Sequence, residues 1–127
     1  MKTLTLLICL SLLSLYNQKK LKMMTKTNFG LICSNLSLVG SDLNAYCQMA
    51  DGSWNYNASM DLDTKVSNED EVLAQCYDGQ GMFFETCTGC YLQSSVLNCD
   101  CTTSDGEDNA TSIDLNNFIT NDNGNLI

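Results

Sequence analysis

An internal duplication constrains the fold of this chain more than any other feature of its sequence. Phe29 and Phe83 each stand four residues before a cysteine, and each of those cysteines, Cys33 and Cys87, is followed fourteen residues later by another. The other matched segments are Ala58–Asp63 with Thr111–Asn116, and Val66–Asp70 with Ile119–Asn123, at a nearly constant offset. A constant offset predicts two copies of one structural unit, repeat one at about 28–80 and repeat two at about 81–127.

Each copy has the pattern of a β-hairpin followed by a third strand. In the first copy, apolar and polar residues alternate from Leu36 to Ala45 across a turn at Gly40-Ser41-Asp42. In the second copy, Tyr91-Leu92 and Val96-Leu97 flank a turn. Third strands are expected around 54–60 and 110–113, each ending in an Asp-Leu-Asp/Asn step that starts a short helical turn at 62–66 or 115–119. The sequence predicts an all-β fold with little helix.

The cysteines favour a disulfide-stabilised fold. Seven of the eight follow residue 28, a density that is ordinary for a small secreted domain and high for a cytosolic one. Cys33 and Cys47 close the open end of the first hairpin, and Cys87 and Cys101 hold the matching positions. A disulfide closing a fourteen-residue loop could contribute about 3 kcal/mol. That amount matters because each half is too small to build a secure core alone.

The remaining cysteines leave alternatives open. Cys90 and Cys99 are the natural second pair of the second hairpin, although the alternation of side chains along a strand then requires a β-bulge or an offset turn. Cys76 is left over as a free thiol. The four cysteines of the second hairpin could instead bind zinc, but zinc ligand pairs usually have two to four intervening residues on both sides. The echo of Cys33 and Cys47 favours disulfides, and we expect no metal.

Catalytic groups are scarce. The chain contains no histidine, which excludes a Ser-His-Asp triad, a Cys-His nucleophile pair and any His-ligated metal. Asp105–Asn109 is acidic but lacks the length and terminal glutamate of a calcium loop. Asp61 and Asp114 recur at one repeat position, which indicates hydrogen bonding in a turn rather than the acid pair of a glycosidase. We therefore expect neither an enzyme nor a cofactor.

The charge of the chain narrows the class of partner. Fifteen acids face six lysines, for a formal net charge of −9, and Lys65 is the one lysine after Asn28. Such a surface repels phosphate backbones and anionic membranes, so neither nucleic acid nor a membrane is expected as a partner. Acidic and amide side chains suit neutral ligands rich in hydroxyl groups.

The N-terminal residues 1–27 form a separate segment, interpreted as a signal peptide or an N-terminal extension. A short charged start leads into an apolar run from Leu4 to Tyr16, which is too short for a membrane span of about 20 residues. No small-x-small cleavage site follows, and four lysines stand directly after the run. The cysteine content favours a secreted protein. A cytoplasmic location is the alternative.

Taken together, these motifs resemble those of the cyanovirin-N homology family over residues 28–127. They are the tandem repeat, Phe-x3-Cys opening each half, cysteines fourteen apart and Ser-x-Asp-Leu-Asx in each half. The extra Cys90 and Cys99 are similar to a variant common in eukaryotic members. The resemblance implies an elongated, pseudo-twofold fold, in which each half combines a three-stranded sheet from one repeat with a hairpin from the other.

The resemblance also implies a function. Family members are lectins that bind mannose-rich oligosaccharides, often terminal α1-2-linked dimannose, without catalysis. Mannose-type glycans or glycoproteins are therefore the expected partners. The protein is expected to be a monomer, or a dimer formed through Cys76 or by domain swapping. The alternative is a secreted structural or interaction protein that keeps the fold and has lost sugar binding.

Two sugar-binding pockets follow from the resemblance, one near the middle of the chain and one near its termini. The central pocket maps onto Ser67, Asn68, Asp70, Glu85, Thr86, Thr102, Thr103 and Ser104. The terminal pocket maps onto Asn121, Asp122, Asn123, Asn28, Leu31, Ile32, Gln48, Met49 and Ala50.

Departures from the family pattern rank the central pocket above the terminal one. Leu31-Ile32 stands where the family has a polar pair, and Asn123 replaces an acid. One departure affects the central pocket instead. Glu71 stands where the second repeat has Gly124, and a glutamate tolerates positive φ poorly, so an altered turn is expected there. Trp54 is expected to pack in the core or to be partly exposed, rather than to stack on a sugar.

Overall fold

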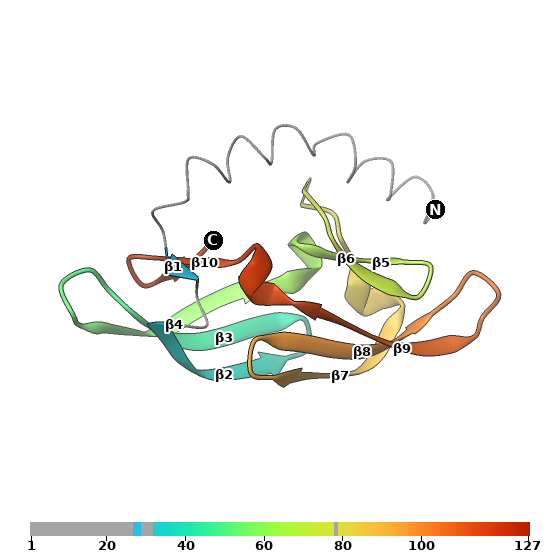
Figure 1. The fold of residues 1–127 in the computed structure, drawn as a ribbon, viewed down its shortest axis with the longest axis horizontal. Coiled ribbons are helices and arrows are strands. Elements are labelled where there is room, and N and C mark those ends of the chain that lie inside the picture. Colours follow the sequence, from blue (N-terminus) through green and yellow to red (C-terminus); the bar gives the residue numbers. More distant parts are fainter. Residues whose placement is uncertain (1–26, 29–31, 78) are drawn as a thin grey trace.

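The computed structural model describes residues 27–28, 32–77 and 79–127, which form short antiparallel β-strands linked by tight turns and single 3-10 turns (Figure 1). Residues 1–26, on which the signal-peptide prediction rests, lie outside the described residues. No helix within the described part is long and apolar enough to cross a membrane.

The same order of elements occurs twice. The first half contains a sheet with the order β2-β3-β4, a 3-10 turn η1 and a hairpin β5-β6. Their bounds are β2 Cys33–Val39, β3 Asp42–Gln48, β4 Trp54–Asp61, η1 Leu62–Thr64, β5 Val66–Glu69 and β6 Val72–Gln75. The third strand and the helical turn lie where the sequence predicts them.

The second half repeats this arrangement after a 3-10 turn, η2, at Phe83–Glu85. It contains the sheet β7-β8-β9, the turn η3 and the strands β10 and β11, with β1 pairing to β10. Their bounds are β7 Cys87–Gln93, β8 Val96–Thr102, β9 Asp108–Asp114, η3 Leu115–Asn117, β10 Thr120–Asp122, β11 Asn125–Leu126 and β1 Thr27–Asn28. The prediction of an all-β fold is confirmed.

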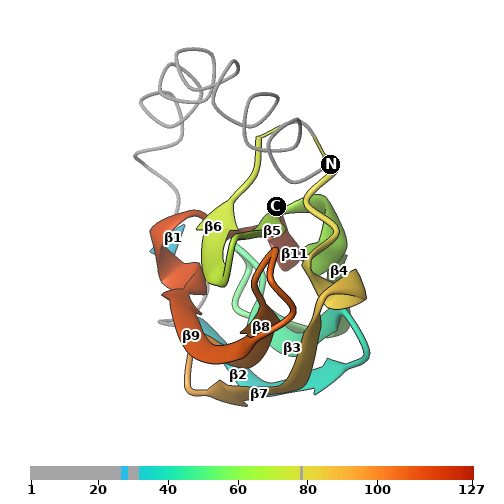
Figure 2. The same ribbon diagram turned by 90° about the vertical axis from the view of Figure 1, so that its right-hand side faces the viewer.

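The hairpins are exchanged between the halves. From β6, the Leu73 backbone N–H donates to Thr111 Oγ1 on β9 at 3.2 Å. From β4, Asn55 Nδ2 donates to the carbonyl oxygen of Gly124, in the β10–β11 turn, at 2.8 Å. Figures 1 and 2 show the β5–β6 hairpin lying over β8 and β9, at the opposite end of the molecule from β1 and β10. Each end of the elongated molecule therefore combines a sheet from one half with a hairpin from the other, as the resemblance implies.

One hydrophobic core runs through both halves, and matched positions of the duplication fill it. Leu43 and Leu97 are fully buried one repeat apart. The other matched core pairs are Leu62 with Leu115 and Val66 with Ile119. Phe83 is buried as expected, whereas its counterpart Phe29 lies outside the described residues.

Three disulfides join the pairs that the sequence predicts: Cys33–Cys47, Cys87–Cys101 and Cys90–Cys99. The third depends on a bulge, because the register of β7 against β8 shifts between Thr88 and Tyr91. Gly89 has a φ of 61° within this shift. The bulge expected from the alternation of side chains is therefore present.

Cys76 is the exception to the predicted cysteine chemistry. It is buried and disulfide-bonded, and no described cysteine is free. The expectation of a leftover free thiol at Cys76 is wrong. That expectation counted only the seven cysteines after residue 28. The whole chain contains eight cysteines, and an even number allows every cysteine to be paired.

Candidate functional site

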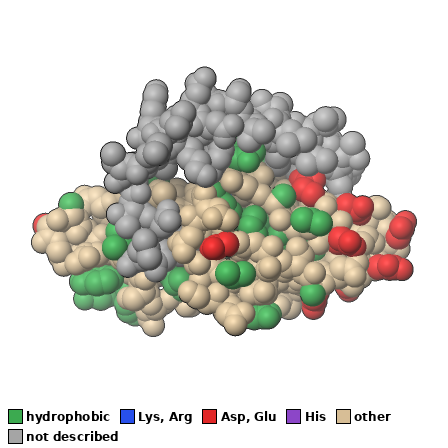
Figure 3. Space-filling view, viewed as in Figure 1, with side chains coloured by type: hydrophobic (Ala, Val, Ile, Leu, Met, Phe, Trp, Pro, Cys, Tyr) green, Lys and Arg blue, Asp and Glu red, His purple; other side chains and the backbone are tan. Residues whose placement is uncertain are grey.

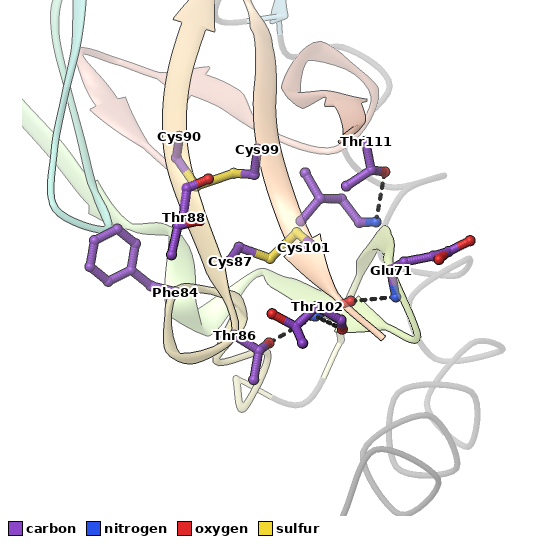
Figure 4. The surroundings of a disulfide bond; sticks show 12 residues. Glu71, Phe84, Thr86, Cys87, Thr88, Cys90, Cys99, Cys101, Thr102 and Thr111 are labelled. Atoms are coloured by element: carbon purple, nitrogen blue, oxygen red, sulfur yellow. Dashed lines mark hydrogen bonds between the residues drawn. A yellow bond between two sulfur atoms is a disulfide. The ribbon is translucent and has the colours of Figure 1, made fainter. Parts of the chain in front are cut away.

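A buried asparagine lies at the centre of the central site. Asn68, on β5, donates from Nδ2 to Thr86 Oγ1 at 2.9 Å and to the Thr102 carbonyl oxygen at 3.0 Å. Its Oδ1 accepts from the Glu71 backbone N–H at 2.8 Å. Figure 4 shows Thr86 and Thr102 at the ends of the two strands that Cys87 and Cys101 join. With 6% of its surface exposed, Asn68 ties the hairpin of the first half to the sheet of the second.

The neighbouring loop is fixed against the same hairpin. Asp70, in the β5–β6 turn, accepts through Oδ1 from the Ser104 backbone N–H at 2.9 Å. Thr103 Oγ1 accepts from the backbone N–H groups of Asp105 and Glu107, at 3.2 Å each. These bonds hold the 103–107 loop opposite the turn.

The structure brings the eight predicted residues of the central pocket together, with different exposures. Asp70, Glu85, Thr86 and Ser104 are exposed, and Thr102 and Thr103 are half-buried. Ser67 is fully buried, and its hydroxyl donates to Glu69 Oε1 at 2.7 Å. Ser67 and Asn68 therefore support the site from within, and the other six form its outer surface.

The terminal site repeats this geometry. Asn121 is 4% exposed, donates from Nδ2 to the Gln48 carbonyl oxygen at 2.9 Å and accepts through Oδ1 from the Gly124 N–H at 2.7 Å. Asn123 Oδ1 accepts from the Ala50 N–H at 2.8 Å, as Asp70 does from Ser104.

Two further predicted residues of the terminal site are half-buried. Asp122 is half-buried beside Asn123, and Gln48 is half-buried with its amide donating to the Gly52 carbonyl oxygen at 3.4 Å. The half-buried Ile32 occupies the position of Thr86, so this site has no hydroxyl there. Leu31 and the side chain of Asn28 lie outside the described residues.

The turn of the central site keeps its shape despite the glutamate. Glu71 has a φ of 78° and Gly124 a φ of 88°, and the residues before them, Asp70 and Asn123, both have a φ of 52°. The expectation that Glu71 alters this turn is wrong. Two contacts hold Glu71 in place, because its N–H bonds Asn68 and its carboxylate accepts from Asn109 Nδ2.

Acidic side chains gather at the end of the molecule that carries the central site. Figure 3 shows them at the right, where Figure 1 places the β5–β6 turn and the β8–β9 loop. The residues are Asp70, Glu71, Asp105, Glu107 and Asp108. In the described part of the chain, Lys65 is the one cationic side chain. This end therefore carries a concentrated negative charge.

Asp63 connects the two halves beneath the central site. Its Oδ1 accepts from the Phe84 N–H at 2.9 Å, and its carbonyl oxygen accepts from the Met82 N–H at 2.7 Å. Burial raises the pKa of Asp63 above its ordinary value. The Phe84 N–H opposes this shift, and repulsion from Asp61, Glu85 and Asp42 adds to it.

The paired aspartates have the turn role that the sequence predicts. Asp61 Oδ1 accepts from Ser41 Oγ at 2.9 Å and from the Asp63 N–H at 3.0 Å. Asp114 Oδ1 makes the matching pair of bonds, to Ser95 Oγ at 2.9 Å and to the Asn116 N–H at 3.0 Å. Each aspartate caps a 3-10 turn and ties it to the preceding hairpin.

Sequence reasoning missed the residues that join each sheet to the exchanged hairpin. Asn109 contacts Glu71, Asn55 contacts Gly124, and Thr111 contacts Leu73. A signal for the two asparagines was present, because the interval between them is the same as that between the matched cysteines that open the two halves. Asparagines at equivalent places in two copies indicate a shared structural role.

Known proteins share both the sequence pattern and the fold. A CVNH domain model matches residues 83–127, which correspond to the second half. The structure of a microvirin–mannobiose complex is similar, with 34% identity, 80% of this chain and 97% of that chain covered, and a TM-score of 0.66. The CVNH protein of T. borchii is 31% identical, with 80% and 98% covered and a TM-score of 0.69.

A third structure shares the fold at lower identity. A MoCVNH3 variant in complex with (N-GlcNAc)4 is 22% identical, with 80% of this chain and 96% of that chain covered and a TM-score of 0.73. The exchanged hairpins and the matched disulfides agree with the likeness to microvirin and to the T. borchii protein. This chain belongs to the cyanovirin-N homology family.

Proposed function

We propose that this protein is a lectin that binds mannose-rich oligosaccharides of the α1-2 type at its central site, without catalysis. The observation that carries the proposal is the exposed group of hydroxyls and carboxylates fixed around the buried Asn68. These groups donate and accept hydrogen bonds to sugar hydroxyls without requiring a charged ligand. The mannobiose named for the microvirin complex supports a mannose ligand.

The roles of the site residues divide by burial. Asp70, Glu85, Thr86 and the loop residues Thr102, Thr103 and Ser104 would contact the sugar. Asn68 and Ser67 would position them, because their side chains are buried and engaged within the protein. At the other end, Gln48, Asp122 and Asn123 would contact sugar, with Asn121 as the positioning residue.

Two sites on one rigid molecule would compensate for weak individual binding. A net hydrogen bond contributes about 0.5–1.5 kcal/mol, so a shallow polar site binds weakly alone. The two sites lie at opposite ends of the elongated fold (Figure 1) and could engage two branches of a glycan, or two glycans, at once. We also propose that the protein is secreted, where its disulfides are stable and such glycans are displayed.

Titration with α1-2 mannobiose, followed by amide NMR shifts, tests the proposal. We expect localised shifts at Asp70, Glu85, Thr86 and 102–104, and a loss of affinity in Glu85→Ala. Asp42→Ala, which removes an exposed acid outside the site, is the matched control.

The other outcomes are equally informative. Shifts confined to Gln48 and Asn121–Asn123 would keep the lectin and reverse the ranking of its sites. A well-dispersed spectrum with no shifts at millimolar sugar would favour the structural or interaction protein.

A further inference from the structure

Three exposed aromatic side chains form one surface on the sheet of the first half. Tyr46, Trp54 and Tyr56 are 37%, 37% and 61% exposed. The ring centroids of Tyr46 and Tyr56 lie 5.0 Å apart, with an interplanar angle of 79°. Trp54 and Tyr56 are two residues apart on β4, so they share a face at a spacing of about 7 Å. We call these three residues the aromatic surface.

The fold does not require aromatic residues at these positions. In the second half, the positions that match Tyr46, Trp54 and Tyr56 hold Asp100, Asp108 and Ala110. The second half forms the same three-stranded sheet with those small or acidic residues exposed. A feature that one copy carries and the other lacks indicates a specific role in the first copy.

The cross-strand neighbours of the aromatic surface are polar and uncharged. Gln48 lies directly opposite Trp54 in the β3–β4 register, and Ser34 lies opposite Tyr46 on β2. Figure 3 shows hydrophobic side chains at the lower left, near one end of the β2–β4 sheet, away from the acidic end. Aromatic rings beside amides and hydroxyls offer an apolar platform with hydrogen-bonding groups at its margin.

The aromatic surface is also continuous with the terminal site, because Gln48 belongs to both. We propose that Trp54, Tyr56 and Tyr46 bind pyranose rings of a neutral oligosaccharide by stacking, and so extend the terminal site along the outer face of the sheet. The best ligands are β1-4-linked chains of sugars with an equatorial O4, such as N-acetylglucosamine, because their equatorial linkages leave flat C–H faces. This proposal rests on the proposed function in assuming an oligosaccharide ligand, but it does not require the central site.

The single tryptophan of the chain makes a direct test possible. The oxidised full chain is titrated with tetra-N-acetylchitotetraose. It is produced without N-glycans, because Asn57-Ala-Ser59 is a glycosylation sequon next to Tyr56. We expect a saturable change in Trp54 emission and amide shifts confined to β3 and β4. Tyr56→Ala should weaken binding by about two- to tenfold, the factor that one aromatic contact commonly contributes.

Tyr91→Ala is the matched control, because Tyr91 is an exposed tyrosine on the sheet of the second half. The affinity of this variant for the oligosaccharide should equal that of the parent. Trp54 emission and β3–β4 shifts that stay constant at millimolar sugar in folded protein would overturn the proposal. So would emission that changes with protein concentration instead of sugar, since that result assigns the surface to self-association. Failure of the proposed function is separate, because it appears as absent shifts at Glu85 and Thr86 with α1-2 mannobiose.

Discussion

Asn68 and Asn121 show how much one buried amide can do in a small fold. Each uses its oxygen to hold the tight turn of its own hairpin and its nitrogen to reach the sheet of the other half. A buried amide that is satisfied in this way stabilises and orients, whereas its loss leaves several polar partners without hydrogen bonds. The family resemblance places both residues in predicted sugar sites, but it does not show that they lie beneath the surface of those sites.

Asn68→Ala should lower the free energy of unfolding by about 1–3 kcal/mol, because the Glu71 N–H and the Thr102 carbonyl lose their partner. Denaturant unfolding of the oxidised protein measures the change as a lower midpoint with the same slope. Asn121→Ala should cost a similar amount, whereas the exposed Glu85→Ala should stay within about 0.5 kcal/mol of the parent. Equal midpoints for Asn68→Ala and Glu85→Ala would contradict the positioning role.

Asp63 predicts a particular dependence of stability on pH. The pKa of Asp63 is raised in the folded state. Its contribution to the free energy of unfolding is therefore fully present at pH values below the ordinary carboxyl pKa of about 4, and it is lost as pH rises through the raised pKa. The second half has Asn116 at this position. Asp63→Asn should therefore gain stability relative to the parent as pH rises from about 3 through the raised pKa of Asp63, while its amide oxygen can still accept from Phe84. Unfolding curves of both proteins across this range test the sign, and a constant difference between them would refute it.

Among the elements, the β2–β3 and β7–β8 hairpins share one backbone shape but fill the same position with different side chains. Both contain a bulge after the first cysteine, with positive φ at Asn35 in one and at Gly89 in the other. Where the second hairpin places the Cys90–Cys99 disulfide, the first places Leu36 and the buried Ala45. The backbone is therefore independent of whether a covalent bond or an apolar contact fills that position.

Replacing the third disulfide with the residues of the other half tests this equivalence. The double variant Cys90→Leu and Cys99→Ala should keep the native fold and lose roughly 2–3 kcal/mol, the contribution expected from closing a nine-residue loop. A native-like amide spectrum with a lower thermal midpoint is the expected result. A poorly dispersed amide spectrum would mean that the bulge of the second hairpin depends on its disulfide. The double variant Cys87→Ala and Cys101→Ala provides the comparison for a larger loop.

The link between the halves includes a glycine that cannot be enlarged. A Cβ at Gly81 would lie 2.1 Å from the Val66 carbonyl oxygen, a clash with backbone that no side-chain rotation relieves. Gly81→Ala should therefore cost at least about 1–3 kcal/mol by overpacking, measured by thermal or denaturant unfolding. Gly106→Ala is the control, because its Cβ would meet open space and only its positive φ of 89° is strained. A smaller cost at Gly81 than at Gly106 would show that the β5 backbone yields.

The sequence predicts long elements better than short ones. Alternation and cysteine spacing located β2, β3, β7 and β8, because seven residues of period two are distinctive. The hairpin β5–β6 is too short for periodicity, and its place over the opposite sheet is set by single contacts such as Leu73 with Thr111. The family resemblance supplied that exchange, and nothing in the local pattern did. The same limit applies to Cys76, whose pairing depends on the whole chain rather than on its neighbours.

The whole molecule is electrically uneven, with acidic side chains gathered at the central-site end and hydrophobic side chains exposed toward the other end (Figure 3). At physiological salt, the electrostatic potential of surface charges is screened over about 8–10 Å. Each site therefore experiences mainly the charges at its own end of the molecule. The two sites, similar in backbone, should therefore differ in the glycans they accept.

A dimannose bearing a phosphate should bind the central site more weakly than neutral dimannose, because Asp70 and Glu85 would repel the added charge. NMR titration at low and high salt separates this effect from shape, since the difference should narrow as salt screens the repulsion. A difference that does not respond to salt would indicate a steric cause instead.

The exchanged hairpins carry a consequence for a single repeat taken alone. A single repeat has a sheet whose covering hairpin is supplied by another copy, so one unit alone leaves its apolar face open. Such a unit could cover that face in the same geometry only by exchanging hairpins with a second copy, as the two halves of this chain do with each other. With both copies in one polypeptide the exchange is intramolecular, and the two halves are free to differ at their surfaces, as Trp54 and Asp108 do at matched positions.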